Sequence, residues 1–200
     1  PPNLPAGGFW NGPAGGSPGG GSTEQALERV VDGLRASPLF PYVAAPDAYH
    51  CPGDLRTKNL RVGAGWAFVS YSKVHGMNGG IGWGIVPFTK TSEIPDPSES
   101  MVFIEEADPR SYNLGTWVLS VWPNPGWIDP FAIFHGEDSS VSFIDGHAEN
   151  HSWLESSTIK AATDSANGTP SFNWAGGSAQ NRDFRWVHQR YKHLDYRPLQ

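Results

Sequence analysis

The chain has 200 residues and a formal net charge of −6, which fits one ordinary domain and gives no reason to expect nucleic acid as a partner. It contains 24 Gly and 18 Pro, but an aromatic share of 12% argues against a disordered chain. Cys51 is the only cysteine, which excludes an internal disulfide and a multi-thiolate zinc site. No apolar run approaches the roughly 18 residues that a membrane-spanning helix needs.

The first element that we predict is a helix that begins after a Gly- and Pro-rich segment. Residues 1–21 predict an extended leader, and a single globular domain is expected over 22–200. Ser22 is placed to cap the helix, and Gln25 can complete a capping box. The apolar stripe that follows consists of Leu27, Val30, Val31 and Leu34. Ser37-Pro38 ends the helix.

The remaining elements are short. Residues 41–97 are irregular, with apolar bursts at 66–69 and 83–86. Strands are predicted over 101–104 and 116–121, and over 141–144 and 148–153 on either side of Asp145-Gly146. From Asp183, the apolar spacing predicts a last helix. The fold class is therefore α+β, with a small antiparallel sheet, long Gly/Pro-rich loops and short flanking helices.

The Asp145-Gly146 pair predicts a two-residue hairpin turn, because both residues tolerate the positive φ that such a turn needs. In that register Phe143 faces Ala148, and both lie on the core side. The polar side then carries Ser140, Ser142, His147, Glu149 and His151. This side is interpreted either as a solvated strand face or as part of a metal site.

In the metal interpretation, Glu149 pairs with either His147 or His151, because residues two apart on a strand lie about 7 Å apart. All three cannot share one ion, since the two histidines lie about 13 Å apart. A third ligand would come from elsewhere, with His135, Glu105 and Glu106 as candidates.

His135 also has two interpretations. As a general base it would be oriented by Asp145 in a triad, but the nearby serines lack a nucleophile-elbow context. Cys51 is the other candidate nucleophile, although its Cys-Pro-Gly-Asp sequence is typical of a structural turn. The alternative is a histidine that bonds a buried carbonyl or carboxylate and holds its loop against the hairpin.

The spacing from His135 to Asp145-Gly146-His147 resembles the H-x9-DG signature of prepilin-type processing-associated proteins, which are type II secretion pseudopilin-like. Further motifs follow in the family's order over about residues 42–191. They are Tyr49-His50-Cys51-Pro52-Gly53-Asp54, Ser70-Tyr71 with Gly76-Met77-Asn78, residues 94–98 with 102–106, and Asp183-Phe184-Arg185-Trp186-Val187. The resemblance implies that His135, Asp145, Gly146, His147, Cys51, Pro52 and Asp54 are structural motif residues.

The resemblance also implies a location and partners. Precursors in this family carry a processing site and a long apolar helix, and Pro1 would fall just past that helix. The chain would then be the soluble head of a protein at the cell surface or in the periplasm, attached to the membrane only through the missing helix. Cys51 would pair with a cysteine absent from this chain, or serve as a small buried apolar residue.

Calcium is the metal that the resemblance suggests, because major pseudopilins hold a calcium ion in a loop of the head. The oxygen ligands would come from Glu105, Glu106, Asp108, Glu137 and Asp138.

Three classes of function follow. The leading one is a non-catalytic head of a pilin-like filament or secretion-associated assembly, with copies of itself or other pilin-like subunits as partners. The alternative is a module that binds polysaccharide or another surface through Trp117, Trp122 and Trp127, which are spaced five apart. A hydrolase comes third.

Overall fold

The computed structural model describes residues 22–59, 68–78, 83–109, 113, 115–169 and 171–200. The expected leader at 1–21 and the first part of the apolar burst at 66–69 lie outside these residues. The helices are α1 (Thr23–Arg35), α2 (Ser156–Ala166) and α3 (Arg182–Arg190). The strands are β1 (Tyr71–Val74), β2 (Met101–Glu105), β3 (Thr116–Trp117), β4 (Leu119–Ser120), β5 (Gly126–Trp127), β6 (Asp138–Phe143) and β7 (Ala148–Ser152). Short 3-10 helices in the described part of the chain lie at Pro46–Tyr49, Leu55–Asn59, Thr91–Glu93 and Pro97–Glu99.

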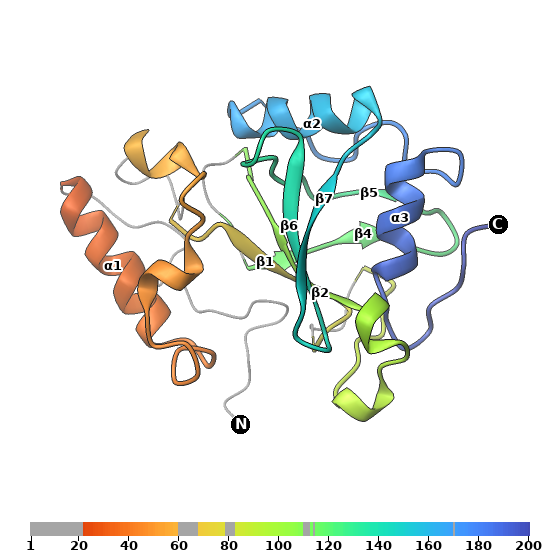
Figure 1. The fold of residues 1–200 in the computed structure, drawn as a ribbon, viewed down its shortest axis with the longest axis horizontal. Coiled ribbons are helices and arrows are strands. Elements are labelled where there is room, and N and C mark those ends of the chain that lie inside the picture. The colour runs from red at the N-terminus through yellow and green to blue at the C-terminus, as the bar shows by residue number, and fades with distance from the viewer. Residues whose placement is uncertain (1–21, 60–67, 79–82, 110–112, 114, 170) are drawn as a thin grey trace.

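The predicted first helix is confirmed as α1. Ser22 Oγ accepts the backbone N–H of Gln25, and the Gln25 side chain accepts the backbone N–H of Ser22, so both halves of the capping box are present. Val30 and Leu34 are fully buried. In Figure 1, α1 lies at one end of the molecule, and α3 and the C-terminus lie toward the other end.

The main sheet has five strands in the order β3-β1-β2-β6-β7, and β4 and β5 form a separate pair. The predicted small antiparallel sheet is correct for β1–β2, β2–β6 and β6–β7, but β1 and β3 are parallel, so the sheet is mixed. The predicted strand 116–121 is split at Val118. The Val118 N–H bonds the Asp129 carboxylate, and strands β3 and β4 on either side pair with different neighbours.

The β6–β7 hairpin differs from its predicted register by one residue. Phe143 N–H donates to His147 O, which makes a three-residue loop of Ile144, Asp145 and Gly146, and Gly146 takes a φ of +95°. Ser142 therefore faces Ala148. A shift of one residue moves every β7 side chain to the other side of the sheet.

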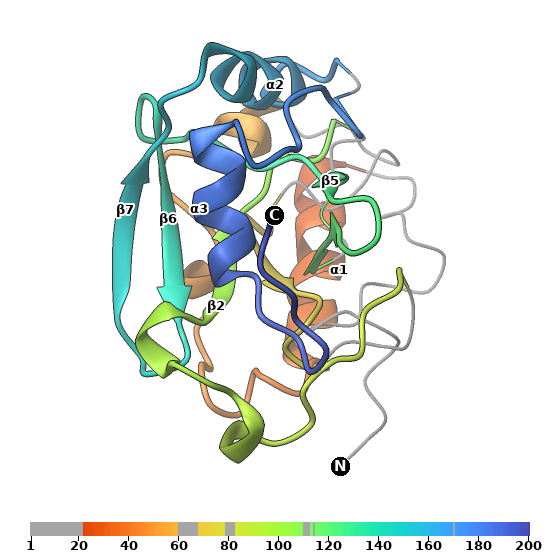
Figure 2. The same ribbon diagram turned by 90° about the vertical axis from the view of Figure 1, so that its right-hand side faces the viewer.

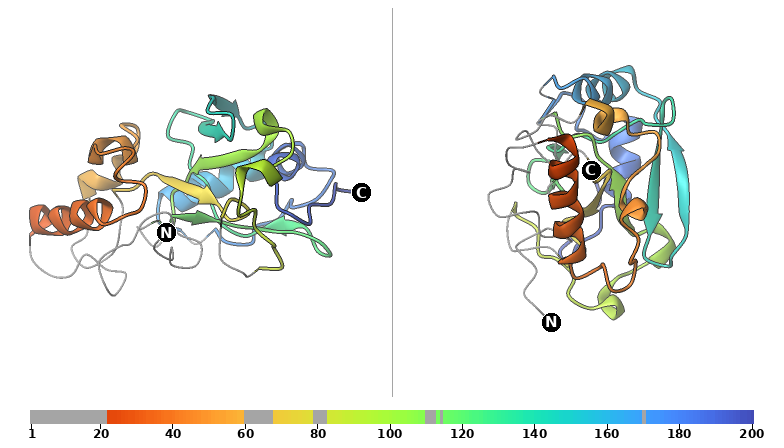
Figure 3. Two further views of the ribbon diagram at one scale, coloured as in Figure 1. Left: turned by 90° about the horizontal axis from the view of Figure 1, so that it is seen from below. Right: turned by 90° about the vertical axis from the view of Figure 1, so that its left-hand side faces the viewer.

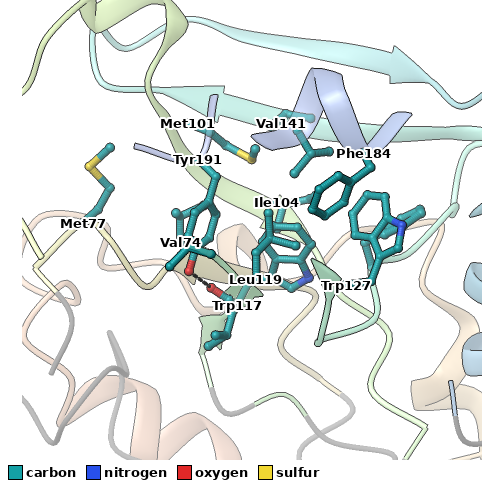
Figure 4. Close-up of a cluster of buried hydrophobic side chains, with 14 of the residues drawn as sticks. Val74, Met77, Met101, Ile104, Trp117, Leu119, Trp127, Val141, Phe184 and Tyr191 are labelled. Carbon is teal, nitrogen blue, oxygen red and sulfur yellow. Dashed lines mark hydrogen bonds between the residues drawn. The ribbon is translucent and has the colours of Figure 1, made fainter. Parts of the chain in front are cut away.

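One side of the sheet packs against α3. Ile104 and Val141 are register partners on adjacent strands, and both belong to the larger hydrophobic core together with Phe184, Val187 and Tyr191 from the C-terminal segment. Figure 2 shows α3 beside the β6–β7 hairpin. Figure 4 shows this core, in which the Tyr191 hydroxyl donates to the Trp117 carbonyl over 3.4 Å.

Helix α2 was not among the predicted elements, and the predicted last helix is confirmed as α3. The buried residues of α2 are Thr158, Ala161, Ala162 and Ser165, which recur at helical spacing but are small. Asn181 caps α3 by accepting the Phe184 N–H over 2.8 Å.

The other side of the sheet carries a second, smaller core. Phe103 points there and packs with Val30, Leu34, Tyr49 and other residues of the α1 region. Figure 3 shows α1 and the following turns standing beside the end of the sheet. None of the described helices combines the length and the apolar character that a membrane span requires.

Candidate functional site

The Cys51-Pro52-Gly53-Asp54 segment forms a tight turn that is bonded to the strands. Asp54 N–H donates to Cys51 O over 2.9 Å, which closes the turn. The Ser70 hydroxyl donates to Asp54 Oδ2 over 2.7 Å, and Cys51 N–H donates to Ser70 Oγ over 3.0 Å. These bonds place the buried Cys51 side chain beside the start of β1.

Arg56 extends this attachment to the end of β2. Its guanidinium forms a two-point ion pair with Asp54, at 2.8 Å for Nε–Oδ1 and 2.6 Å for Nη2–Oδ2. It also donates to Asn113 Oδ1, and the Asn113 amide donates to the carbonyls of Val69 and Glu106. The sequence analysis did not single out Arg56 or Asn113, because neither lies in a motif and the contact between them spans 57 positions of the chain.

The loop before β6 brings His135 to the same place. Ala132 N–H donates to Glu105 O, and Ser140 N–H in β6 donates to Glu105 Oε2 over 2.9 Å, so Glu105 is bonded on both sides of His135. Gly53 touches this loop closely: a Cβ added there would lie 2.8 Å from Phe134 O. The Cys51 turn and the His135 loop are therefore in direct contact.

Cys51, Glu105 and His135 meet at this contact. The Cys51 Sγ lies 3.4 Å from His135 Nε2, and His135 Nε2 lies 3.1 Å from Glu105 Oε1. Cys51 and Glu105 are buried, whereas the His135 side chain is 38% exposed. His135 therefore bonds a buried carboxylate, as one of its two interpretations predicted.

The Cys51 thiol is protonated at neutral pH in this environment. Burial and a hydrogen bond with Glu105 raise its pKa to about 11. Burial and the nearby Cys51 also raise the pKa of the Tyr71 phenol. A protonated thiol is a poor nucleophile.

The geometry does not form a catalytic relay. In a relay, the histidine faces the nucleophile with one ring nitrogen and the orienting carboxylate with the other. Here His135 Nε2 faces both Cys51 and Glu105. The predicted His135–Asp145 pair is wrong, because the two residues lie at opposite ends of β6 and Asp145 Oδ1 instead lies 2.6 Å from His147 Nδ1.

The predicted calcium ligands do not come together. Glu105 faces His135, whereas Glu106 accepts the hydroxyl of Ser72. Burial and the charge of Asp129 raise the pKa of Glu106 well above its usual range. Asp108 is buried, and Glu137 and Asp138 lie nearer the surface. Within the described ranges, Cys51, Glu105 and His135 are the one set of three metal-ligating side chains whose ligand atoms all lie within 4.8 Å of one another.

The residues predicted for the polar side of the hairpin also lie elsewhere in the structure. Because of the shifted register, His151 faces α3 and stacks on Trp186 with ring centroids 3.5 Å apart. Glu149 lies opposite Val141, and His147 stacks on Phe143. Neither predicted metal pair of this strand is part of the group of three.

The three tryptophans of the predicted binding surface are not on one surface. Trp117 and Trp127 are buried in the core, as Figure 4 shows. Trp122 is 52% exposed and lies beside the Arg197 guanidinium. A stacking platform made of these three residues is therefore excluded.

An apolar groove of about 450 Å³ lies on the side of the sheet that faces away from α3. Its lining comes from the segment after α1 and from β1, β2, β6 and β7, and consists of Leu39, Val43, Ala48, Tyr49, Tyr71, Phe103, Ser140, Val141, Ser142 and Ala148. Ala148 was predicted to be core, and the register shift leaves it exposed on the groove.

No protein-family model, curated protein or solved structure matches the chain. The resemblance to pseudopilin-like proteins therefore stays a prediction that rests on the motifs.

Proposed function

We propose that the chain is the non-catalytic structural head of a pilin- or pseudopilin-like subunit, displayed at the cell surface or in the periplasm. The observation that carries this proposal is that the motif side chains bond to one another and to neighbouring residues of the fold. His135 bonds Glu105, Asp54 bonds Arg56 and Ser70, and Asp145 bonds its own hairpin.

These bonds suit a scaffold rather than a reaction centre. The contacts of His135 connect segments that are far apart in sequence, because His135 is 84 positions from Cys51 and 30 positions from Glu105. The protonated Cys51 thiol and the shared His135 nitrogen support the same conclusion.

The groove supports a role in assembly. Subunits of an assembly pack through surfaces whose centres are apolar, and contiguous apolar patches on a soluble domain commonly mark such contacts. The partners would be copies of this chain or other pilin-like subunits, and an apolar segment of the neighbouring subunit would fill the groove.

The test is to express the complete gene in the organism that encodes it, with Ala148→Arg placed at the groove. Ala148 is exposed, so the substitution adds a charge to the groove without removing a core side chain. We expect the wild-type head in the sheared surface fraction and in filaments labelled with an antibody against the head. The variant is expected to lose most of that incorporation.

Thr163→Arg is the matched control, because it adds the same charge to an exposed position of α2 away from the groove. It should assemble like the wild type, and circular dichroism should show that both variants fold. Wild-type protein confined to the cytoplasm would refute the proposal, as would equal incorporation of the two variants.

A further inference from the structure

Three metal-ligating side chains from three different segments converge where β2 ends. Cys51 comes from the turn before β1, Glu105 is the last residue of β2, and His135 lies in the loop before β6. Their ligand atoms all lie within 4.8 Å of one another. The three-way convergence distinguishes this site from an ordinary ion pair.

We propose that Cys51, Glu105 and His135 bind one Zn²⁺ ion. Tetrahedral zinc with Zn–S of about 2.3 Å and Zn–N and Zn–O of about 2.0–2.1 Å separates sulfur from nitrogen by about 3.5 Å, and nitrogen from oxygen by about 3.3 Å. The observed separations are 3.4 Å for Sγ–Nε2 and 3.1 Å for Nε2–Oε1. Two of the three ligand separations thus match those of a zinc tetrahedron, and the third, from Cys51 Sγ to the Glu105 carboxylate, lies within 4.8 Å.

The direction of the His135 ring supports coordination rather than acid–base chemistry. Sulfur and carboxylate both lie in front of the same ring nitrogen, Nε2. An ion placed between the three atoms binds all of them at once, whereas one N–H shared between two acceptors makes two bent and weaker hydrogen bonds. Binding releases the Cys51 thiol proton to solvent and leaves a thiolate on the metal.

The ligand types select the metal. Thiolate, imidazole and carboxylate together are a zinc set, whereas calcium takes six to eight oxygens. Cys51 supplies sulfur and His135 supplies nitrogen, so only Glu105 would suit calcium. This site is therefore different in both metal and residues from the calcium loop suggested by the resemblance.

The surroundings hold the ligands in place. Ser140 N–H bonds Glu105 Oε2, which leaves Oε1 for the metal. The Asp54 N–H donates to Cys51 O over 2.9 Å and fixes the turn that carries the Cys51 sulfur. The exposed part of His135 opens the site to solvent, through which the ion enters and from which a water completes the coordination.

The bound ion would tie together segments that are remote in the chain, and the inference does not depend on filament assembly. The experiment uses tag-free protein, because an affinity tag of histidines would bind metal itself. The metal-free chain is titrated with Co²⁺, which reports by absorption. We expect one equivalent to bind, with tetrahedral d–d bands and a thiolate-to-cobalt charge-transfer band. Zn²⁺ should then displace the cobalt.

Cys51→Ser should remove the charge-transfer band, and Glu105→Gln and His135→Gln should each weaken zinc binding by about 100-fold or more. Both replacements to Gln keep the side-chain size, and circular dichroism checks that they fold. His147→Gln is the control, because His147 lies at the other end of the hairpin and bonds Asp145. It should bind zinc like the wild type.

The inference is overturned if wild-type protein shows no thiolate band, or if Cys51→Ser binds zinc as tightly as the wild type. Hydrolysis of an ester substrate by the zinc-loaded wild type, lost in His135→Gln, would support the metal site and refute the non-catalytic function. Zinc binding without surface assembly would support the metal site and contradict the proposed function.

Discussion

Gly53 lies where the Cys51 turn touches the loop that carries His135. A Cβ at this position would lie 2.8 Å from Phe134 O and 3.2 Å from Phe134 Cβ. Neither atom is the end of a flexible side chain, so the loop itself would have to move. We therefore expect Gly53→Ala to lower the free energy of unfolding by about 1–3 kcal/mol, measured by chemical denaturation.

Gly126→Ala is the control for this substitution. Its added Cβ would come no closer than 3.9 Å to Ser120 Cβ, which is an ordinary contact. The expected change is within about 0.5 kcal/mol. Equal effects of the two substitutions would show that the turn and the loop are not in close contact.

At the scale of elements, a buried carboxylate of α3 holds the start of α2. Asp183, in the first turn of α3, is 1% exposed and accepts the backbone N–H groups of Leu154 and Glu155, where α2 begins. Glu155 stands at the N-cap position of α2 but makes no side-chain cap of its own. Asp183 therefore caps the entry of α2 from a distance: it bonds the N–H groups of the N-cap residue and of the residue before it, and not those of the first turn.

Asp183→Ala should lower the free energy of unfolding by about 3 kcal/mol, because it leaves two N–H groups of the α2 start without their acceptor. Thermal or urea unfolding followed by circular dichroism would measure this change. Asp32→Ala serves as the control, since the Asp32 side chain is 70% exposed and pairs with Arg35 at the surface. A loss of about 0.5 kcal/mol or less is expected there. Similar losses for both would refute the capping role of Asp183.

This cap also explains why α2 was missed while α1 and α3 were predicted. Helices α1 and α3 carry large apolar residues at helical spacing and are capped by the neighbouring Ser22 and Asn181. Helix α2 buries Thr158, Ala161, Ala162 and Ser165, and its cap lies 28 residues from Glu155. The local sequence of α2 therefore contains neither large apolar residues at helical spacing nor a neighbouring cap residue.

Strand β1 was missed for a related reason. It buries Ser72 and Lys73 as well as Val74, so its residues do not alternate between apolar and polar. The buried Lys73 ammonium donates to the carbonyls of Val74 and Met77, one and four residues further along the chain, and such a partner for a lysine is not visible in an apolar pattern. The hairpin was located correctly, but the third loop residue moved the register by one position and sent His151 to the other side of the sheet.

At the scale of the whole molecule, the individual residues of the site were predictable but their meeting was not. Cys51, Glu105 and His135 were each singled out from the sequence, with separate roles. Their convergence depends on the order β1-β2-β6, which places the ends of three distant segments side by side. No spacing within a single segment encodes that order.

Buried histidines around α3 make the stability of the whole molecule sensitive to acid. Burial lowers the pKa of His188 to about 4, and the charges of His193 and Lys192 add to this effect. Burial also lowers the pKa of His151 to about 4; Arg190 adds to this, whereas Asp183 and Asp138 oppose it. His188 Nδ1 and His151 Nε2 are buried without a hydrogen-bond partner. Both rings are therefore neutral in the folded protein at pH values where an unfolded histidine is charged.

The unfolded chain consequently takes up protons below about pH 6.5, its ordinary histidine pKa, while the folded chain does so only near pH 4. Stability is full above pH 6.5 and falls as the pH drops toward 4, by at most about 1.4 kcal/mol per pH unit for each histidine. Urea unfolding at several pH values, with a chelator present to exclude bound metal, should show this fall. His188→Phe keeps an aromatic ring between Phe184 and Tyr196 and should make the fall shallower. Gln189→Ala, at an exposed position of the same helix, is the control and should leave the pH dependence of the free energy of unfolding unchanged. A wild-type pH dependence in His188→Phe would show that His188 does not become charged on unfolding.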